Sequence, residues 1–214
     1  DDILNLPPMG CINVHSSLLP KYRGAAPINW AVINGETETG VTIMYMAAEL
    51  DAGDIIAQAA TPIDPDETVV ALHDRLAVLG AELLVNVVAD IAAGTATRTP
   101  QEHGKATLAP MLSRELSPMD WSRPARALHN QVRGLVPWPA AVTELGGNRC
   151  KVFSTSVLDA TTSAAPGTIL AAGKEGIQVA CGGGTVLRID ELQADGGKRM
   201  KAADYLRGHP IPVG

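Results

Sequence analysis

The chain has 214 residues, of which 46% are hydrophobic and 19% are charged, as in folded globular proteins and unlike disordered or fibrous ones. Its three cysteines, Cys11, Cys150 and Cys181, are widely spaced and form no CxxC motif, which argues against a disulfide framework and against a zinc site. No apolar run reaches the roughly 18 residues of a membrane helix and no secretory signal is recognisable, so we expect a cytoplasmic protein that does not enter a membrane.

The formal net charge of −6 is unevenly distributed along the chain. Residues 1–109 carry 5 Lys and Arg against 14 Asp and Glu, whereas residues 110–214 carry 12 against 9. An acidic half followed by a mildly basic half is typical of a catalytic domain joined to a domain that contacts a polyanion. Differences of this size also occur between unrelated small domains, so charge by itself is weak evidence for nucleic-acid binding.

The first half of the chain alternates predicted strands and helices. In order, the elements are a buried strand over 9–15, a loop over 16–24, a short helix over 27–34, strands over 41–46 and 55–59, and a long helix over 67–93. Apolar residues recur every three or four positions in the long helix, and Gly94 follows as a stop signal. This order predicts an α/β domain with a mostly parallel sheet, of which only about three strands are present.

The second half is predicted to be rich in short strands. A polar linker over 98–118 precedes a helix over 122–133, and the turn Pro137-Trp138-Pro139 follows. The remaining elements are strands over 142–145, 151–157, 168–172, 177–180 and 186–192 and a short helix over 200–207. Five short strands separated by glycine-rich turns favour a small closed barrel, of which the OB type is a common nucleic-acid reader. Trp138 suits stacking on a base, or packing at a domain junction.

Three polar residues are candidates for acyl-transfer chemistry. Asn13 and His15 lie on the same face at the C-terminal end of the first predicted strand, and Asp51 lies at a later junction of strand and turn. An amide and a protonated imidazole can donate hydrogen bonds to an oxyanion, and a carboxylate can help to remove a proton from an attacking amine. A histidine at a strand end is more often structural, so these residues taken by themselves are a weak signal.

Two longer motifs make the prediction specific. INVHSSLLPKYRGAAP (12–27) and LDAGDIIAQ (50–58) resemble the signature of the 10-formyltetrahydrofolate-dependent formyltransferases. The resemblance implies that Asn13, His15 and Asp51 are the catalytic residues. It also implies that a segment lines the folate site, and that segment consists of Ser17, Leu18, Leu19 and Pro20. No metal is implied.

Four further segments indicate the acceptor. Residues 35–46, 103–115, 119–145 and 202–208 resemble the methionyl-tRNA branch of the family. That resemblance implies initiator methionyl-tRNA as the partner, held by a basic face of an OB-like C-terminal domain, and a monomeric enzyme. The candidate tRNA contacts are Arg23, Lys198, Arg199 and Lys201, although each also suits a solvated surface.

The resemblance also sets the expected domain organisation. Residues 1–97 are expected to be part of a Rossmann-like formyltransferase domain, 98–118 a linker, and 119–214 the OB-like tRNA-binding domain. The family's N-terminal strands and helices, on the order of 90 residues, are not matched before Asp1. We therefore expect a fragment whose first half lacks strand partners and which has little activity by itself.

Two other functions are also compatible with the sequence. The bacterial UDP-4-amino-4-deoxyarabinose formyltransferases share the catalytic signature, but residues 106–115 and 202–208 fit the methionyl-tRNA enzymes better. A non-catalytic nucleic-acid-binding OB module explains residues 120–214 but assigns no role to Asn13, His15 and Asp51. A glycinamide ribonucleotide formyltransferase is disfavoured because it lacks the second domain.

Overall fold

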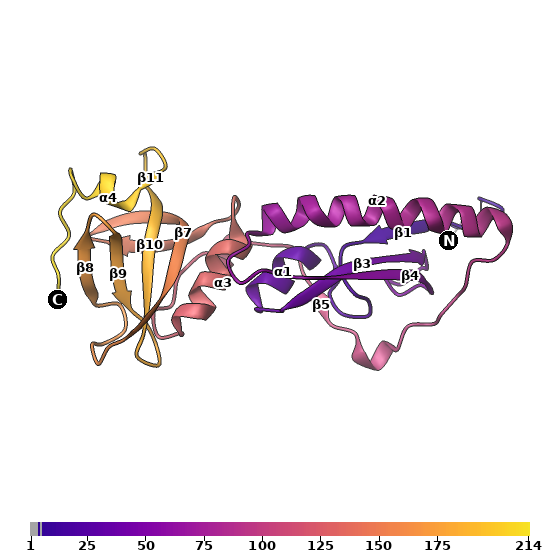
Figure 1. Ribbon diagram of the computed structural model, residues 1–214, viewed down its shortest axis with the longest axis horizontal. Helices are drawn as coiled ribbons and strands as arrows, with labels where there is room; N and C mark the ends of the chain where they lie inside the picture. Colours follow the sequence, from indigo (N-terminus) through magenta and orange to yellow (C-terminus); the bar gives the residue numbers. More distant parts are fainter. Residues whose placement is uncertain (1–3, 5) are drawn as a thin grey trace. The chain divides into compact units, whose positions relative to one another are not determined.

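The computed structural model describes residue 4 and residues 6–214, and it divides into two compact units (Figure 1). Unit 1 is built from residues up to Ala31 and from Glu36–Met111, and unit 2 from Val32–Gly35 and Leu112–Gly214. The segment 98–118, predicted as a linker, is therefore shared between the units. It contains two 3-10 helices and a short strand, which are described below.

The described elements up to Ala109 are mostly those that the sequence predicts. They are β1 (Ile12–His15), β2 (Arg23–Gly24), α1 (Pro27–Ile33), β3 (Glu38–Tyr45), β4 (Ile55–Pro62), α2 (Val69–Ala93), η1 (His103–Lys105) and β5 (Leu108–Ala109). The short strand β2 pairs in parallel with β5, which the sequence did not predict.

The main sheet of unit 1 has the strand order β1-β3-β4, and both pairings are antiparallel. The prediction of a mostly parallel sheet is therefore wrong for the described strands. Only residues 46–54 connect β3 to β4, and a parallel pair needs a crossover of a dozen or more residues. The apolar pattern of β3 reports burial on both faces, and that pattern does not fix strand direction.

The long helix α2 confirms the prediction for residues 67–93 to within two residues. Thr68 caps its N-terminus by accepting a hydrogen bond from the Ala71 backbone, and Gly94 ends it with a φ of 70°. Its buried side packs on the sheet, where Gly80 lies against Val14 and Val41. Since Val14 faces α2, its neighbours Asn13 and His15 point to the opposite face of the sheet.

The outer side of α2 is partly apolar, and it also exposes charged residues such as Asp74 and Glu82. Its exposed hydrophobic residues are Val70, Val78, Val85 and Val88. By length and composition the helix is apolar enough to cross a membrane, so the expectation that no segment reaches this threshold is wrong for residues 69–93. The core helix of a soluble protein also passes this test, and the buried side of α2 contacts β3 and β4.

An ion pair between Glu67, which lies just before α2, and Arg75 of α2 yields a pH-dependent prediction. Arg75 donates to Glu67 at 2.8 Å, and this hydrogen bond with its positive charge holds the pKa of Glu67 below the usual carboxyl range. The pair therefore stabilises the fold above that range, and the stability is lost as the pH falls through the lowered pKa. We expect Glu67→Gln to reduce the free energy of unfolding by about 0.5–1 kcal/mol at pH 7. Urea unfolding at pH 7 and near pH 2 tests this, because the difference should vanish in acid.

Unit 2 contains one antiparallel sheet. Its elements are η2 (Arg114–Leu116), α3 (Ala125–Leu135), β6 (Ala141–Leu145), β7 (Asn148–Thr161), β8 (Ile169–Gly173), β9 (Gly176–Ala180), β10 (Thr185–Ala194), β11 (Met200–Lys201) and α4 (Ala202–Tyr205). The strand order is β6-β7-β10-β9-β8, with β11 on β10. The described pairings leave β6 and β8 as edges, so the predicted closed OB-type barrel is not confirmed. Closure requires pairing between the first and last strands, which strand number and turn spacing do not determine.

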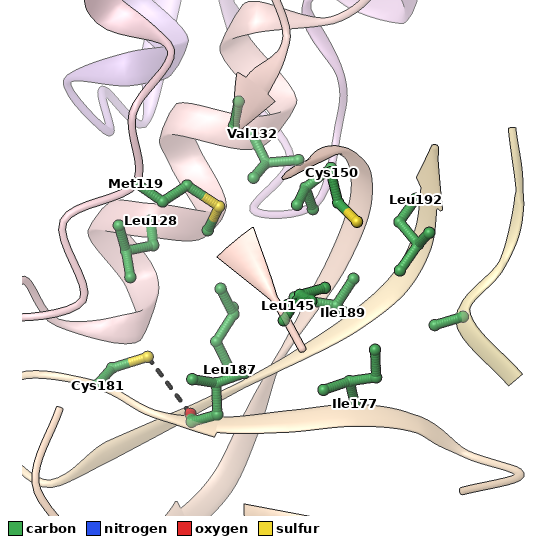
Figure 2. Packing of buried hydrophobic residues seen from close by; sticks show 14 of the residues in the cluster. Met119, Leu128, Val132, Leu145, Cys150, Ile177, Cys181, Leu187, Ile189 and Leu192 are labelled. Carbon is green, nitrogen blue, oxygen red and sulfur yellow. Dashed lines mark hydrogen bonds between the residues drawn. The ribbon is translucent and has the colours of Figure 1, made fainter. Parts of the chain in front are cut away.

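The core of unit 2 lies between this sheet and α3 (Figure 2). Leu128 and Val132 of α3 pack against a cluster that includes Leu187 and Ile189 of β10. Cys181 belongs to this core, where burial raises the pKa of its thiol to about 11. Its thiol contacts the Val179 carbonyl oxygen at 3.5 Å, so this cysteine behaves as a small core residue.

Candidate active site

His15 is the last residue of β1, and its side chain is 6% exposed. Its Nε2 lies 2.9 Å from the backbone carbonyl oxygen of Tyr22. A carbonyl oxygen can only accept a hydrogen bond, so Nε2 must carry a proton. Nδ1 lies 3.7 Å from Oδ2 of Asp51. Nδ1 is thus the nitrogen that can exchange a proton with a reacting group near Asp51.

Asp51 lies in the connection between β3 and β4 with a φ of 47°, which is uncommon for a residue other than glycine. Its Oδ2 accepts a hydrogen bond of 2.8 Å from the backbone N–H of Gly24. The turn requires a glycine at position 53, because a Cβ there would lie 1.8 Å from the Tyr45 carbonyl oxygen. The fold of this loop therefore brings the carboxylate to the imidazole across 36 residues of sequence.

Asn13 completes the set of predicted catalytic residues on β1. It is half-buried and pairs in register with Met44, two positions from the pair of His15 with Thr42. Alternation along the strand places Asn13 and His15 on one face of the sheet. The structure therefore gathers an amide, an imidazole and a carboxylate in one region of unit 1.

The predicted folate-lining segment divides into buried and accessible residues. Ser17 and Leu19 are buried, and the Leu19 N–H donates to the Thr42 hydroxyl at 3.1 Å. Leu18 and Pro20 line a pocket of about 580 Å³ in unit 1. Its other lining residues are Lys21, Tyr22, Glu36, Thr37, Glu38, Thr39 and Lys105. Two of the four predicted residues can thus contact a bound molecule in this pocket, and the other two hold the loop.

Arg23, a candidate tRNA contact, is buried in unit 1. Its Nε and Nη2 donate to Oε1 of Gln101 at 3.1 and 2.7 Å, and Nη2 lies 3.3 Å from Nδ1 of His103. In this conformation the Arg23 guanidinium contacts residues inside unit 1 and is not exposed to a tRNA phosphate. No local motif signals the role of Gln101, because its contact with Arg23 spans 78 residues of sequence.

The predicted basic cluster of unit 2 is exposed but partly paired. It consists of Lys198, Arg199 and Lys201. Nε of Arg199 donates to Glu191 at 3.0 Å, which reduces the positive charge available to a ligand. Lys201 lines a pocket of about 260 Å³ that also holds Glu175, Asp190 and Glu191. The surroundings of the cluster are therefore mixed in charge.

A second surface of unit 2 carries three basic residues and was not among the predicted tRNA contacts. Glu144 and Asp195 also line it. Two pockets of about 560 and 270 Å³ share Arg114, Ser117, Val142 and Arg149, and together we call them the Arg114–Arg149 groove. Lys151 and Trp138 line the smaller pocket, and Trp138 is 52% exposed. The exposed ring fits the stacking interpretation of this residue. Among residue 4 and residues 6–214, no group of three or more His, Cys, Asp or Glu residues is arranged to hold a metal ion.

Comparisons with known proteins show which family this chain resembles. Residues 1–88 match the formyl transferase domain model and residues 111–210 match the model of the formyl transferase C-terminal domain. The chain is 50% identical to the methionyl-tRNA formyltransferase of Trichlorobacter lovleyi over 99% of its own length and 66% of that protein. It is 50% identical to that of Acetivibrio thermocellus over 100% and 68%, and 46% identical to that of Bacillus subtilis over 100% and 67%.

Solved structures share the fold at lower identity. HypX from Aquifex aeolicus in complex with tetrahydrofolic acid aligns with a TM-score of 0.72 at 20% identity, over 94% of this chain and 36% of that one. The N-formyltransferase from Helicobacter canadensis aligns with a TM-score of 0.70 at 19% identity, over 83% and 65%. The chain spans about two thirds of the length of the curated relatives named above.

Proposed function

Because the chain belongs to the methionyl-tRNA formyltransferase family, we propose that it transfers a formyl group from 10-formyltetrahydrofolate to methionyl-tRNA for translation initiation. The observation that carries this proposal is identity of about 50% along the whole chain, unit 2 included. Formyltransferases with other acceptors share the donor chemistry, so similarity that extends beyond the catalytic motif favours the tRNA acceptor. A cytoplasmic, monomeric protein that does not enter a membrane is part of the same proposal.

The site residues support a direct transfer. The amino nitrogen of the methionyl group attacks the formyl carbon, a C–N bond forms, and the formyl oxygen gains negative charge. We assign Asn13 and protonated His15 Nδ1 as hydrogen-bond donors to that oxygen. The bond from the formyl carbon to N10 of the folate then breaks, and the proton lost by the amine passes to the departing nitrogen. Asp51, 3.7 Å from His15, stabilises the imidazolium and assists this proton transfer.

For the donor we propose that Leu18 and Pro20 contact the folate and that Ser17 and Leu19 keep their loop in place. The accessible pair lines the 580 Å³ pocket, a volume in the range of small-molecule sites. The buried pair is fixed by hydrogen bonds, in which Ser17 Oγ donates to the Lys21 carbonyl oxygen at 2.7 Å. Arg23 is proposed to act from inside unit 1, by holding the active-site loops, and not as a phosphate contact.

For the acceptor we propose that unit 2 is an OB-like tRNA-binding domain. The Arg114–Arg149 groove offers cationic side chains beside an exposed aromatic ring, the combination that binds single-stranded nucleic acid. The cluster of Lys198, Arg199 and Lys201 is a second contact, weakened by the pairing of Arg199 with Glu191.

Two triple variants of the full chain test these contacts. We expect Arg114→Ala, Arg149→Ala and Lys151→Ala together to weaken binding of methionyl-tRNA by tenfold or more, and to reduce the salt dependence of binding by a slope of about two to three. Alanines at Lys198, Arg199 and Lys201 should have a smaller effect. Arg207→Ala, at an exposed arginine paired with Asp204, is the control. If the variant at Lys198, Arg199 and Lys201 lost more tRNA affinity than the variant at Arg114, Arg149 and Lys151, the groove would not be the stronger tRNA contact. Absence of salt-dependent tRNA binding by the unsubstituted chain would favour a sugar-nucleotide acceptor.

A further inference from the structure

The segment Gln101–Ala109, which we call the strap, contacts two loops of the candidate site. One contains Tyr22, whose carbonyl oxygen faces His15, and the other carries Asp51. Its strand β5 pairs in parallel with β2, which aligns Arg23 with Leu108 and Gly24 with Ala109. Gly24 in turn donates its N–H to Asp51. The sequence indicated an irregular linker here, but the contacts show that residues 101–109 form part of the support of the site.

Thr107 of the strap fixes the backbone that holds His15. Its hydroxyl accepts the Tyr22 N–H at 2.9 Å, and its carbonyl oxygen accepts the Arg23 N–H at 2.8 Å. Tyr22 has a φ of 62°, a left-handed conformation that is strained for a bulky residue and therefore needs external support. With its peptide held in this way, the Tyr22 carbonyl oxygen lies 2.9 Å from His15 Nε2.

Gln101 of the strap fixes the loop that carries Asp51. Its amide nitrogen donates to the carbonyl oxygens of Asp51 and Gly53 at 2.9 and 2.8 Å. Its amide oxygen accepts two hydrogen bonds from Arg23. The side chain is buried, so each of these bonds would leave a costly unpaired group if its partner were removed. One amide thus ties the Asp51 loop to the loop that contains Tyr22 and Arg23.

We propose that Thr107 and Gln101 are positioning residues for the transfer. Thr107 acts through the Tyr22 carbonyl oxygen to keep one proton of His15 on Nε2 in both charge states. Nδ1 is then the nitrogen that gains the second proton beside Asp51 and donates it in a hydrogen bond to the formyl oxygen. Gln101 keeps Asp51 within reach of that nitrogen. The catalytic purpose of this arrangement rests on the proposed function, whereas the tautomer and the loop geometry do not.

The test is ¹⁵N NMR of the His15 imidazole in the full chain at pH 8.5, where an ordinary imidazole is neutral. We expect the unsubstituted chain and Thr107→Ser to show Nε2–H. We expect Thr107→Val, which removes the acceptor but keeps the shape, to show a mixture of both tautomers. In formyl-transfer assays the valine variant should lower kcat about tenfold with little change in KM for methionyl-tRNA, and serine should restore it. Thr97→Val is the matched control, because the Thr97 hydroxyl donates to the Ile56 carbonyl oxygen on the exposed surface.

Several results would overturn the proposal. One is an Nδ1–H tautomer in the unsubstituted chain, a measurement that needs no variant to fold. Another is an unchanged Nε2–H tautomer in Thr107→Val accompanied by a lower melting temperature, which would show a purely structural role. For Gln101, we expect Gln101→Glu to accelerate backbone hydrogen exchange in residues 51–54 and to lower kcat more than it raises KM. If the chain transfers no formyl group while the tautomers behave as expected, the proposed function fails and the positioning geometry stands.

Discussion

His15→Ala is expected to lower formyl transfer to methionyl-tRNA by about 10²–10⁴-fold and to leave tRNA affinity unchanged. Loss of a positioned acid–base group costs a factor in this range. The buried imidazole belongs to unit 1, whereas the basic residues proposed to bind tRNA belong to unit 2. Single-turnover assays with the chain in excess, together with filter binding of tRNA, measure the two quantities.

The matched control for this prediction is His73→Ala. His73 lies on α2 with a side chain that is 65% exposed, and its partner is the neighbouring Asp74. The His73→Ala variant should therefore keep the full rate of formyl transfer. If His15→Ala also kept the full rate, the catalytic assignment would be lost, and retained tRNA affinity in that case would favour a non-catalytic binding module.

Leu187→Ala is expected to reduce the free energy of unfolding of unit 2 by about 2–5 kcal/mol. Leu187 is fully buried on β10, the strand that pairs with both β7 and β9, and its side chain lies in the centre of the core (Figure 2). Removing three carbon atoms leaves a cavity that the surrounding strands cannot close. Hydrogen exchange of the β10 amides under native conditions measures the loss within this unit.

Val213→Ala provides the comparison for the core variant. Val213 is 60% exposed near the C-terminus, so its truncation should change the free energy of unfolding by less than about 0.5 kcal/mol. An equally small effect of Leu187→Ala would mean that the core of unit 2 collapses around the missing side chain. Such an outcome would contradict the close packing described for the cluster.

Local patterns in the sequence predicted local structure well. The heptad-like spacing of leucines and valines predicted α2, because one face of a helix repeats every 3.6 residues and the Gly94 signal marks its end. The catalytic motif predicted that the side chains of residues 15 and 51 meet, and their atoms lie 3.7 Å apart. That second prediction rests on the position of both residues at strand ends and on the resemblance to a family, not on periodicity.

Long-range contacts that no recognised motif covers could not be predicted. The direction of β3 relative to β1 and the open edges of the second sheet follow from hydrogen bonds between distant strands, which leave no periodic trace. The roles of Gln101 and Thr107 were hidden for the same reason, since a polar stretch with Gly104 reads as a loop. The burial of Arg23 reverses the expectation for an arginine in a loop, because its partner lies 78 residues away.

The strand that bears Asn13 and His15 is also the border of its sheet, since β1 pairs with β3 on one side and has no further neighbour in the described strand order. A polypeptide that added itself to this border would lie about 4.8 Å from the catalytic strand. Self-association through this edge would therefore place a second chain next to Asn13 and His15 and inhibit the transfer. Specific activity should therefore decline with protein concentration before any precipitate is visible.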